Sequence, residues 1–251
     1  MILPNSGYYL RSIELLQAQI TDFSEYPFVL PAFRQLKTLE FHPKVTFIVG
    51  ENGTGKSTLL EAIAVAWGFN PEGGTLNFNF SSRESHSALY NYIRLIRNIK
   101  KPRDGFFLRA ESFYNLATNI EKLDEESFGP RIIESYGGCS LHEQSHGEAF
   151  FAIFMKRFKG KGLYILDEPE AALSPLRQMS MISRIHDLVG QESQFIIATH
   201  SPIIMAYPDA SIWELTASGF EQVEYEQTGH YNVMREFINN RGKMLKILMQ
   251  P

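Results

Sequence analysis

The chain of 251 residues has one cysteine, no long apolar run and little net charge. The single cysteine, Cys139, excludes an internal disulfide bond and fits a reducing compartment. No uninterrupted apolar run approaches the roughly 20 residues that a membrane-spanning helix needs. The first ten residues also lack the apolar core of a signal peptide. We therefore expect a cytoplasmic protein with no membrane segment of its own.

The chain also has no large excess of positive or negative charge. The 24 lysines and arginines nearly balance the 28 aspartates and glutamates, which gives a formal net charge of -4. Such a balance does not indicate nucleic-acid binding for the chain as a whole. Positive charge is concentrated only in a flank from Arg94 to Arg103, with Arg83 and His86 before it. This basic flank fits either a solvated helix face or a surface for a partner.

Short apolar runs and helical patterns alternate along most of the chain. The predicted strands cover residues 8–15, 36–41, 45–49, 75–80, 105–109, 162–166, 195–198, 212–215 and 220–225. The predicted helices cover residues 57–67, 87–100, 111–123, 148–158, 175–189 and 234–249. This order predicts an α/β fold with a mostly parallel central sheet, formed by a single domain over residues 1–251.

The sequence GENGTGKST occupies residues 50–58, between a predicted buried strand and a predicted helix. It fits the phosphate-loop pattern G-x-x-x-x-G-K-[ST]. Glycines let such a loop wrap around phosphate, and backbone amides with the positive end of the helix stabilise the anion. The lysine reaches the β- and γ-phosphates, and the serine binds Mg²⁺. The expected nucleotide-binding residues are Asn52, Gly53, Thr54, Gly55, Lys56, Ser57 and Thr58.

A second motif follows the predicted strand at residues 162–166, which runs directly into Asp167, Glu168 and Pro169. A carboxylate at the end of a buried strand can hold the Mg²⁺ shell, and Asp167 stands at that position. The adjoining Glu168 can orient or deprotonate an attacking water. An acidic pair that simply opens a surface loop is the alternative interpretation.

Three further motifs stand in order with these two. They are Ser145-His146-Gly147-Glu148 before the acidic pair, and Ala172-Leu173-Ser174 and His200 after it. In this order the chain resembles the ATP-binding-cassette superfamily, which includes transporter cassettes, SMC proteins and related DNA-repair ATPases. The runs LYILDEPEAALSP and IIATHSP are similar to a bacterial group of small cassette ATPases often called AAA-type. The resemblance implies a core at residues 1–80 and 160–251, an antiparallel β subdomain, and a small helical insertion at about 81–159 that carries the signature motif.

The resemblance also implies the cofactors ATP and Mg²⁺ and a homodimer that forms on ATP binding. In relatives, the signature serine and glycine complete the nucleotide site of the partner subunit, which assigns Ser145 and Gly147 to a site in trans. His146 and Glu148 stand where the family has glycine and glutamine. From the residues alone, Ser145 and Glu148 also form a capping box. By resemblance His200 contacts the γ-phosphate, whereas a lone histidine is by default bonded to backbone.

The family normally has a glutamine after the strand that follows the phosphate-loop helix, and none stands there in this chain. Glu111, after the predicted strand at 105–109, is the candidate substitute at Mg²⁺ or its water. An ordinary acid in the first turn of a helix is the alternative, and Arg109 is a candidate ion-pair partner. An adenine-stacking aromatic is not assigned, because Tyr26, Phe28 and Phe33 each also fit the core.

Three functions remain open. The first is a cytosolic ATPase with Glu168 and His200 in catalysis, which drives a nucleic-acid or defence-related process with nucleic acid or an unknown protein as partner. The second is the nucleotide-binding subunit of a transporter. The third is an ATP switch that does not hydrolyse, against which Glu168 argues. The segment from Lys56 to Ser145 is too short for the long coiled coil of SMC proteins.

Overall fold

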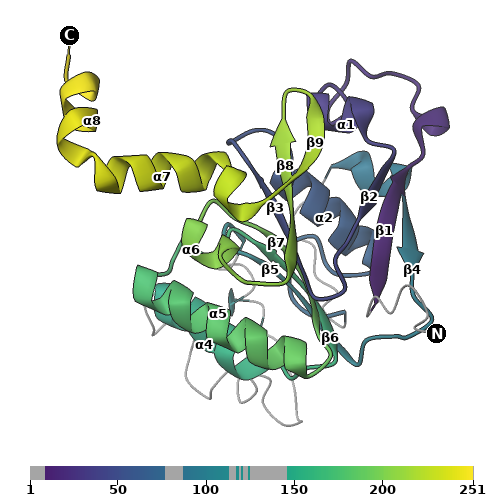
Figure 1. Ribbon diagram of the computed structural model, residues 1–251. Helices are drawn as coiled ribbons and strands as arrows, with labels where there is room; N and C mark the ends of the chain where they lie inside the picture. Colours follow the sequence, from purple (N-terminus) through teal and green to yellow (C-terminus); the bar gives the residue numbers. More distant parts are fainter. Residues whose placement is uncertain are drawn as a thin grey trace, which may run out of the picture.

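The computed structural model of the protein describes residues 9–76, 87–112, 117, 118, 120, 124 and 146–250. A six-stranded sheet forms its centre, in the order β5-β6-β7-β3-β8-β9 (Figure 1). Its strands are β3 (Val45–Gly50), β5 (Asp104–Arg109), β6 (Gly162–Asp167), β7 (Gln194–Ala198), β8 (Ala210–Thr216) and β9 (Gly219–Val223). Neighbouring strands are parallel except for the hairpin of β8 and β9. The expected α/β class with a mostly parallel central sheet is confirmed.

Alternate residues of the central strands face two different cores, because side chains along a strand point to opposite faces in turn. Phe47 belongs to the core formed with α4 (His146–Arg157) and α5 (Pro175–Gly190). The next residue, Ile48, belongs to the core on the other face, formed with α2 (Lys56–Trp67). Strands β3, β6 and β7 are buried over their whole length, as parallel strands covered on both faces are. The buried strands therefore hold the loops at the ends of the sheet in fixed positions.

A separate sheet of three antiparallel strands packs against α2. It consists of β1 (Leu10–Leu15), β2 (Thr38–Glu40) and β4 (Ile93–Arg97), in the order β2-β1-β4. The helix predicted over residues 87–100 is wrong, because those residues form the 3₁₀ helix η2 (Ala88–Tyr92) and then β4. Apolar residues recur there at helical spacing, but pairing with the distant β1 decides the conformation. Within the range 81–159 that the sequence assigned to a helical insertion, β4 and β5 thus belong to sheets and α4 is helical.

The C-terminal helix predicted over residues 234–249 is two helices, α7 (Gly229–Asn239) and α8 (Arg241–Leu248). Asn240, at φ −124° and ψ 33°, separates them. Both project from the body of the protein (Figure 1, yellow). The other described helices are α1 (Pro31–Gln35), α6 (Pro202–Met205), η1 (Gln17–Gln19) and η4 (Tyr225–Gln227). Most of the strand predicted at 75–80 and of the helix predicted at 111–123 lies outside the described residues. In the part of the chain that the structure describes, no helix has the length and apolar character to span a membrane.

The carboxyl ends of four parallel strands meet at one edge of the central sheet. Ala198 at the end of β7 pairs in register with Ile48 of β3 and with Asp167 at the end of β6. Asp167 in turn pairs with Arg109 at the end of β5. The last residues of these strands and the loops after them carry the phosphate-loop motif, the acidic pair and His200. Open α/β sheets bind their ligands at this edge.

Candidate nucleotide site

The phosphate loop between β3 and α2 depends on glycines in left-handed backbone conformations. Gly50 and Gly55 have φ values of 143° and 103°, which residues with a side chain rarely adopt. A Cβ on Gly50 would also lie 2.7 Å from the carbonyl oxygen of Leu215, and one on Gly55 would lie 2.8 Å from the ring of Phe33. The loop therefore needs glycine at both positions of the motif for its shape alone.

Lys56, the first residue of α2, folds its side chain back over this loop. Its Nζ donates hydrogen bonds to the carbonyl oxygens of Gly50 (2.8 Å) and Glu51 (2.9 Å). The residue is only 5% exposed, and burial lowers the pKa of its ammonium group, against the opposing effect of nearby carboxylates. The loop thus holds a buried cation above its own backbone, as a phosphate cradle requires.

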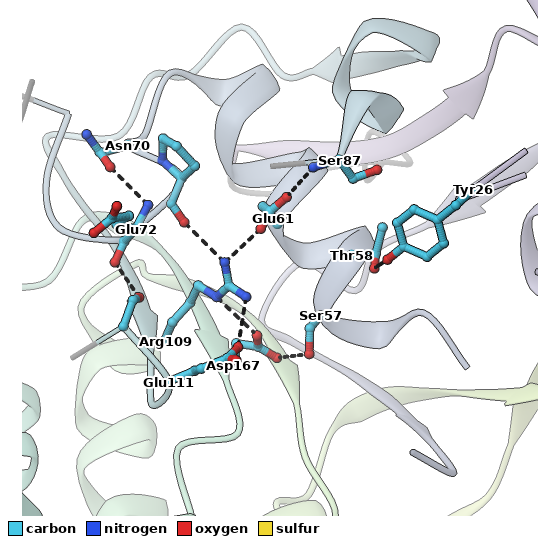
Figure 2. A network of polar contacts seen from close by, with 12 residues as sticks. Tyr26, Ser57, Thr58, Glu61, Asn70, Glu72, Ser87, Arg109, Glu111 and Asp167 are labelled. Atoms are coloured by element: carbon cyan, nitrogen blue, oxygen red, sulfur yellow. Dashed lines mark hydrogen bonds and ion pairs between the residues drawn. The ribbon is translucent and has the colours of Figure 1, made fainter. Parts of the chain in front are cut away.

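Ser57 and Asp167 meet between α2 and the end of β6, as the sequence predicts. The hydroxyl Oγ of Ser57 donates to Oδ1 of Asp167 at 3.1 Å (Figure 2). Asp167 is 4% exposed. Burial raises its pKa to about 6, although the Arg109 guanidinium and the Ser57 hydroxyl both lower it. Arg109 and Ser57 thus offset only part of the cost of burying the negative charge of Asp167, so a bound cation would stabilise this carboxylate.

Arg109 joins three carboxylates beside this pair (Figure 2). Its Nη1 lies 2.7 Å from Oε2 of Glu61, its Nη2 lies 3.3 Å from Oε2 of Glu111, and its Nε lies 3.6 Å from Oδ2 of Asp167. The pairing of Arg109 with Glu111 is confirmed, and the side chain of Glu111 is 85% exposed. Sequence reasoning missed Glu61, whose signal is an acid on the buried side of α2.

The site opens into a hollow of about 520 Å³. The residues that line it come from the phosphate loop, the end of β5 and the segment after β6. They are Asn52, Gly53, Ser57, Ala110, Glu111, Asp167, Glu168 and Ala171. Five residues predicted for ATP, Mg²⁺ and catalysis therefore share one cavity with the candidate substitute Glu111.

Glu168 and His200 face each other across the ends of β6 and β7. Nε2 of His200 lies 3.5 Å from Oε1 of Glu168, and it is a buried atom with no hydrogen-bond partner. Burial lowers the pKa of His200, and the nearby Lys56 and His230 lower it further. Glu168 has a φ of 51°, and its N–H donates to the carbonyl oxygen of Ala198 at 2.9 Å. The backbone of β7 thus fixes Glu168 beside the histidine.

Two residues that the sequence did not single out hold His200 in place. The backbone N–H of His200 donates to Oε1 of Glu170 at 2.5 Å. On the other side, Nδ1 of His200 lies 2.9 Å from Nε2 of His230, in the first turn of α7. Proximity in the sequence to the acidic pair could have suggested Glu170. No local signal in the sequence connects His230 with His200.

The signature motif is described only from its second residue, since Ser145 lies outside the described residues. Gly147, in the first turn of α4, packs against the segment after β6. A Cβ on Gly147 would lie 2.3 Å from the carbonyl oxygen of Ala172, so only glycine allows this approach. Glu148 points to Arg177 of α5, with 3.6 Å between Oε1 and Nη2. The capping box of Ser145 and Glu148 stays a prediction.

Among the three aromatic candidates for stacking on adenine, only Tyr26 is exposed. Its exposed fraction is 62%, whereas those of Phe28 and Phe33 are 6% and 0%. The hydroxyl of Tyr26 lies 2.5 Å from Oγ1 of Thr58, which stands in the first turn of α2 (Figure 2). Tyr26 is therefore the aromatic face available beside the phosphate loop.

The basic flank is largely occupied by local contacts. Arg94 pairs with Glu14 (2.7 Å), Lys100 pairs with Glu192 (2.7 Å), and Arg97 lies over the ring of Trp67. Arg103 instead borders a second hollow of about 730 Å³ at the opposite, amino-terminal ends of β5 and β6. That hollow is lined by Arg103, Asp104, Arg157, Lys159, Gly160, Lys161, Gly190, Gln191 and Glu192.

A family model described as an AAA domain, AAA_23, matches residues 29–168, which is more than half of the chain. The chain belongs to the AAA_23 family. The match includes the phosphate loop, the signature region and the acidic pair. The family and the fold together place the chain in the ABC/SMC-like ATPase superfamily, with an ABC-type nucleotide-binding domain.

Individual relatives of this AAA_23 chain agree with that placement. The ABC transporter G family member STR2 of Medicago truncatula is 27% identical over 172 residues, which cover 63% of this chain and 24% of that protein. The phosphate import ATP-binding protein PstB 1 of Streptococcus agalactiae is 25% identical over 199 residues, or 71% of this chain and 78% of that protein. A solved ATP-binding cassette of an ABC transporter superposes with a TM-score of 0.50 at 14% identity, covering 96% of this chain and 99% of the other. The chain thus spans about a quarter of the length of STR2, and the solved cassette shares its fold.

Proposed function

We propose that the protein binds Mg²⁺-ATP at the carboxyl edge of the central sheet and hydrolyses it to ADP and phosphate. The observation that carries this proposal is the convergence of Lys56, Ser57, Asp167, Glu168 and His200 from the ends of three adjacent strands. A glycine-rich turn that matched the motif by chance would not bring an acidic pair and a histidine to the same edge.

The site fits both parts of the ligand. Mg²⁺ commonly uses one or two protein ligands and takes the rest from phosphates and water. Ser57 and Asp167 provide such a pair, and the buried charge of Asp167 lacks full compensation. Bound there, Mg²⁺ would neutralise charge that develops on the phosphates. Lys56 exchanges its contacts with the loop carbonyls for the β- and γ-phosphate oxygens, and Tyr26 stacks on the adenine.

Glu168 and His200 divide the chemical work on the γ-phosphate. The carboxylate of Glu168 accepts a hydrogen bond from the attacking water and orients it, and can take its proton. Nε2 of His200, which is buried without a hydrogen-bond partner, would turn to the γ-phosphate when ATP binds, where a hydrogen-bond donor stabilises the negative charge of the transition state. Glu111, tied to Arg109 at the rim of the hollow, would contact Mg²⁺ or its water.

The active form is a homodimer that encloses two ATP molecules. This proposal rests on the resemblance of Ser145-His146-Gly147-Glu148 to the family's signature motif, because the contact of Gly147 with Ala172 lies within one chain. In the dimer, Ser145 and Gly147 of one copy complete the site of the other. The cytoplasm is the compartment that supplies Mg²⁺-ATP.

Two variants test the ATPase proposal. Lys56→Ala removes the cation of the phosphate loop and should abolish ATP binding, measured with a fluorescent ATP analogue. Glu168→Gln keeps the shape of the site and removes the carboxylate. It should bind ATP but not hydrolyse it, and should therefore accumulate as an ATP-bound dimer in size-exclusion chromatography with light scattering. Unchanged ATP affinity in the first variant would contradict the assignment of the ATP site. A second variant that stays monomeric with Mg²⁺-ATP would contradict the homodimer.

The hollow with Arg103 and Lys159 supports a nucleic-acid process as the work that hydrolysis drives. Four cations line it against two carboxylates, in a chain whose net charge is negative, and phosphate backbones bind to such surfaces. DNA or RNA should raise the rate of ATP hydrolysis in the wild type and not in Lys159→Glu. If neither nucleic acid has an effect and a membrane permease co-purifies with the Glu168→Gln variant, the rival role as a transporter subunit is correct. The similarity to PstB 1, a phosphate import ATP-binding protein, supports that rival.

A further inference from the structure

We propose that His230 is a positioning residue that holds His200 in the tautomer with its proton on Nε2. The effect of His230 on hydrolysis rests on the proposed ATPase function, whereas its contact with His200 does not. Nε2 of His230 lies 2.9 Å from Nδ1 of His200, and the two rings stand edge to face with their centroids 5.0 Å apart. The separation of 2.9 Å between the two nitrogens is that of a direct hydrogen bond.

The backbone around His230 is fixed on both sides. Thr228, fully buried, caps α7 by accepting from the N–H of Tyr231 (3.4 Å) and donates to the carbonyl oxygen of Tyr225 (2.8 Å). The hydroxyl of Tyr225 donates to the carbonyl oxygen of Pro202 (2.9 Å), two residues after His200. The first turn of α7 is thus tied to the segment that carries His200, and His230 has a defined position opposite it.

The environment of His200 favours a neutral ring. The ring is partly buried, and Lys56 lies close enough to oppose a second positive charge, so the pKa of His200 is lowered. Glu168 and Glu51 act in the opposite direction and do not reverse the shift. A neutral imidazole has one N–H and one bare nitrogen. Because the ring of His200 then has only one N–H, its contact with Nε2 of His230 requires one of the two nitrogens to donate and the other to accept.

Glu168 and His230, on opposite sides of the ring, together decide which nitrogen of His200 carries the proton. Nε2 of His200 is buried, lies 3.5 Å from Oε1 of Glu168 and makes no hydrogen bond. A bare nitrogen there would direct its lone pair at an anion, whereas an N–H is attracted to it. The proton therefore sits on Nε2, Nδ1 accepts, and Nε2–H of His230 is the donor. Nδ1 of His230, also buried without a partner, then presents a lone pair and leaves no N–H unpaired.

This tautomer is the one that the proposed reaction needs. With its proton on Nε2, the ring of His200 can donate to an oxygen of the γ-phosphate while it remains neutral. The other tautomer would present a lone pair to the phosphate and repel it. His230 does not touch the substrate in this arrangement, and acts on the reaction only through His200. The Michaelis constant for ATP should therefore depend little on His230, because Lys56 and the phosphate loop supply most of the binding.

The tautomer can be measured without nucleotide by long-range ¹H–¹⁵N correlation NMR of protein with ¹⁵N-labelled histidine. The signals of His200 are assigned by their loss in His200→Gln. The wild type should show the protonated Nε2 and bare Nδ1. His230→Phe fills the same space without a donor and should give a mixture of tautomers. Val233→Ala, at a position 67% exposed on the same helix, is the control and should leave the spectrum of His200 unchanged. A proton on Nδ1 in the wild type, or an unchanged tautomer in His230→Phe, would overturn the proposal.

Steady-state kinetics gives a second measurement. His230→Phe should lower kcat by at least about tenfold, as loss of the correct histidine tautomer does elsewhere, with a change in KM of less than about threefold. His230→Gln restores an N–H donor and should recover most of kcat. In the His200→Gln background, His230→Phe should have no further effect. If His230→Phe keeps the kcat of the wild type, the proposed role of His230 is refuted and the ATPase proposal is not affected. Absence of hydrolysis in the wild type refutes the ATPase proposal, and the NMR result still decides on His230.

Discussion

Replacing Asp167 with asparagine should make the nucleotide-free protein more stable at alkaline pH. Burial raises the pKa of Asp167 from 3.8 to about 6, so the folded state disfavours the charged carboxylate. A carboxyl group with a raised pKa contributes its full stability below pH 3.8, and that contribution is lost as the pH rises through about 6. Asparagine has no charge to bury and avoids this loss. Ser57 can keep its hydrogen bond, because an amide accepts or donates as required.

The magnitude follows from the two pKa values. A rise from 3.8 to about 6 corresponds to about 3 kcal/mol of free energy of unfolding at pH 8, since each pH unit of pKa is worth about 1.4 kcal/mol. At pH 5 the folded carboxyl is mostly protonated, and the linkage relation leaves about half of that cost. Asp167→Asn should therefore gain about 1.5 kcal/mol more at pH 8 than at pH 5. Comparing the two pH values removes any constant effect of the new side chain.

Urea denaturation in the presence of EDTA measures both free energies, and thermal unfolding should follow at about 2–4 °C per kcal/mol for a chain of this length. Asp187→Asn, at an exposed position of α5, is the matched control and should change stability by less than about 0.5 kcal/mol at either pH. Mg²⁺-ATP should stabilise the wild type and not Asp167→Asn. If the variant gains no more stability at pH 8 than at pH 5, the buried charge of Asp167 is not a cost to the fold and the reasoning fails.

Three further changes test other parts of the molecule. Tyr164→Phe removes a buried hydroxyl that donates to Asp104 (2.8 Å) and accepts two backbone N–H groups; it should cost about 1–3 kcal/mol in urea denaturation and leave the KM for ATP unchanged. Gly147→Ala places a Cβ 2.3 Å from a carbonyl oxygen; ATP binding to the monomer should persist, while light scattering should show less ATP-dependent dimer. Tyr26→Ala should weaken ATP binding about tenfold through lost stacking, whereas Tyr26→Phe should bind normally in the same fluorescence titration.

The phosphate loop and the central strands could be predicted because their signals are local. Gly50 and Gly55 stand at positions that only glycine can occupy, and the apolar runs of β3, β6 and β7 are those of strands buried on both faces. The order of the motifs along the chain then placed Asp167 near Ser57. That contact is now a hydrogen bond of 3.1 Å.

The failures have one physical origin, which is dependence on partners distant in the sequence. Residues 93–97 carry apolar side chains at helical spacing, yet they form a strand because β1 offers a pairing edge. His230 stands in the first turn of α7 without any motif around it, and only the path of the chain from β9 into α7 brings it to His200. No periodicity within either segment contains that information.

The two residues of the acidic pair both have unfavourable local features, a buried charge and a left-handed backbone. The central sheet explains how these features are maintained. Asp167 buries a charge, and Glu168 adopts a φ of 51°, which costs a residue with a side chain about 1–3 kcal/mol. Neither residue could hold this state in a loose loop. Asp167 is still inside the ladder between β5 and β7, and the N–H of Glu168 continues the ladder to Ala198. The sheet thus enforces a strained backbone and a buried charge at its carboxyl edge. A bound cation and a positioned water would lower the energy of such a site. The two residues that weaken the fold, Asp167 and Glu168, are therefore the ones expected to carry the reaction.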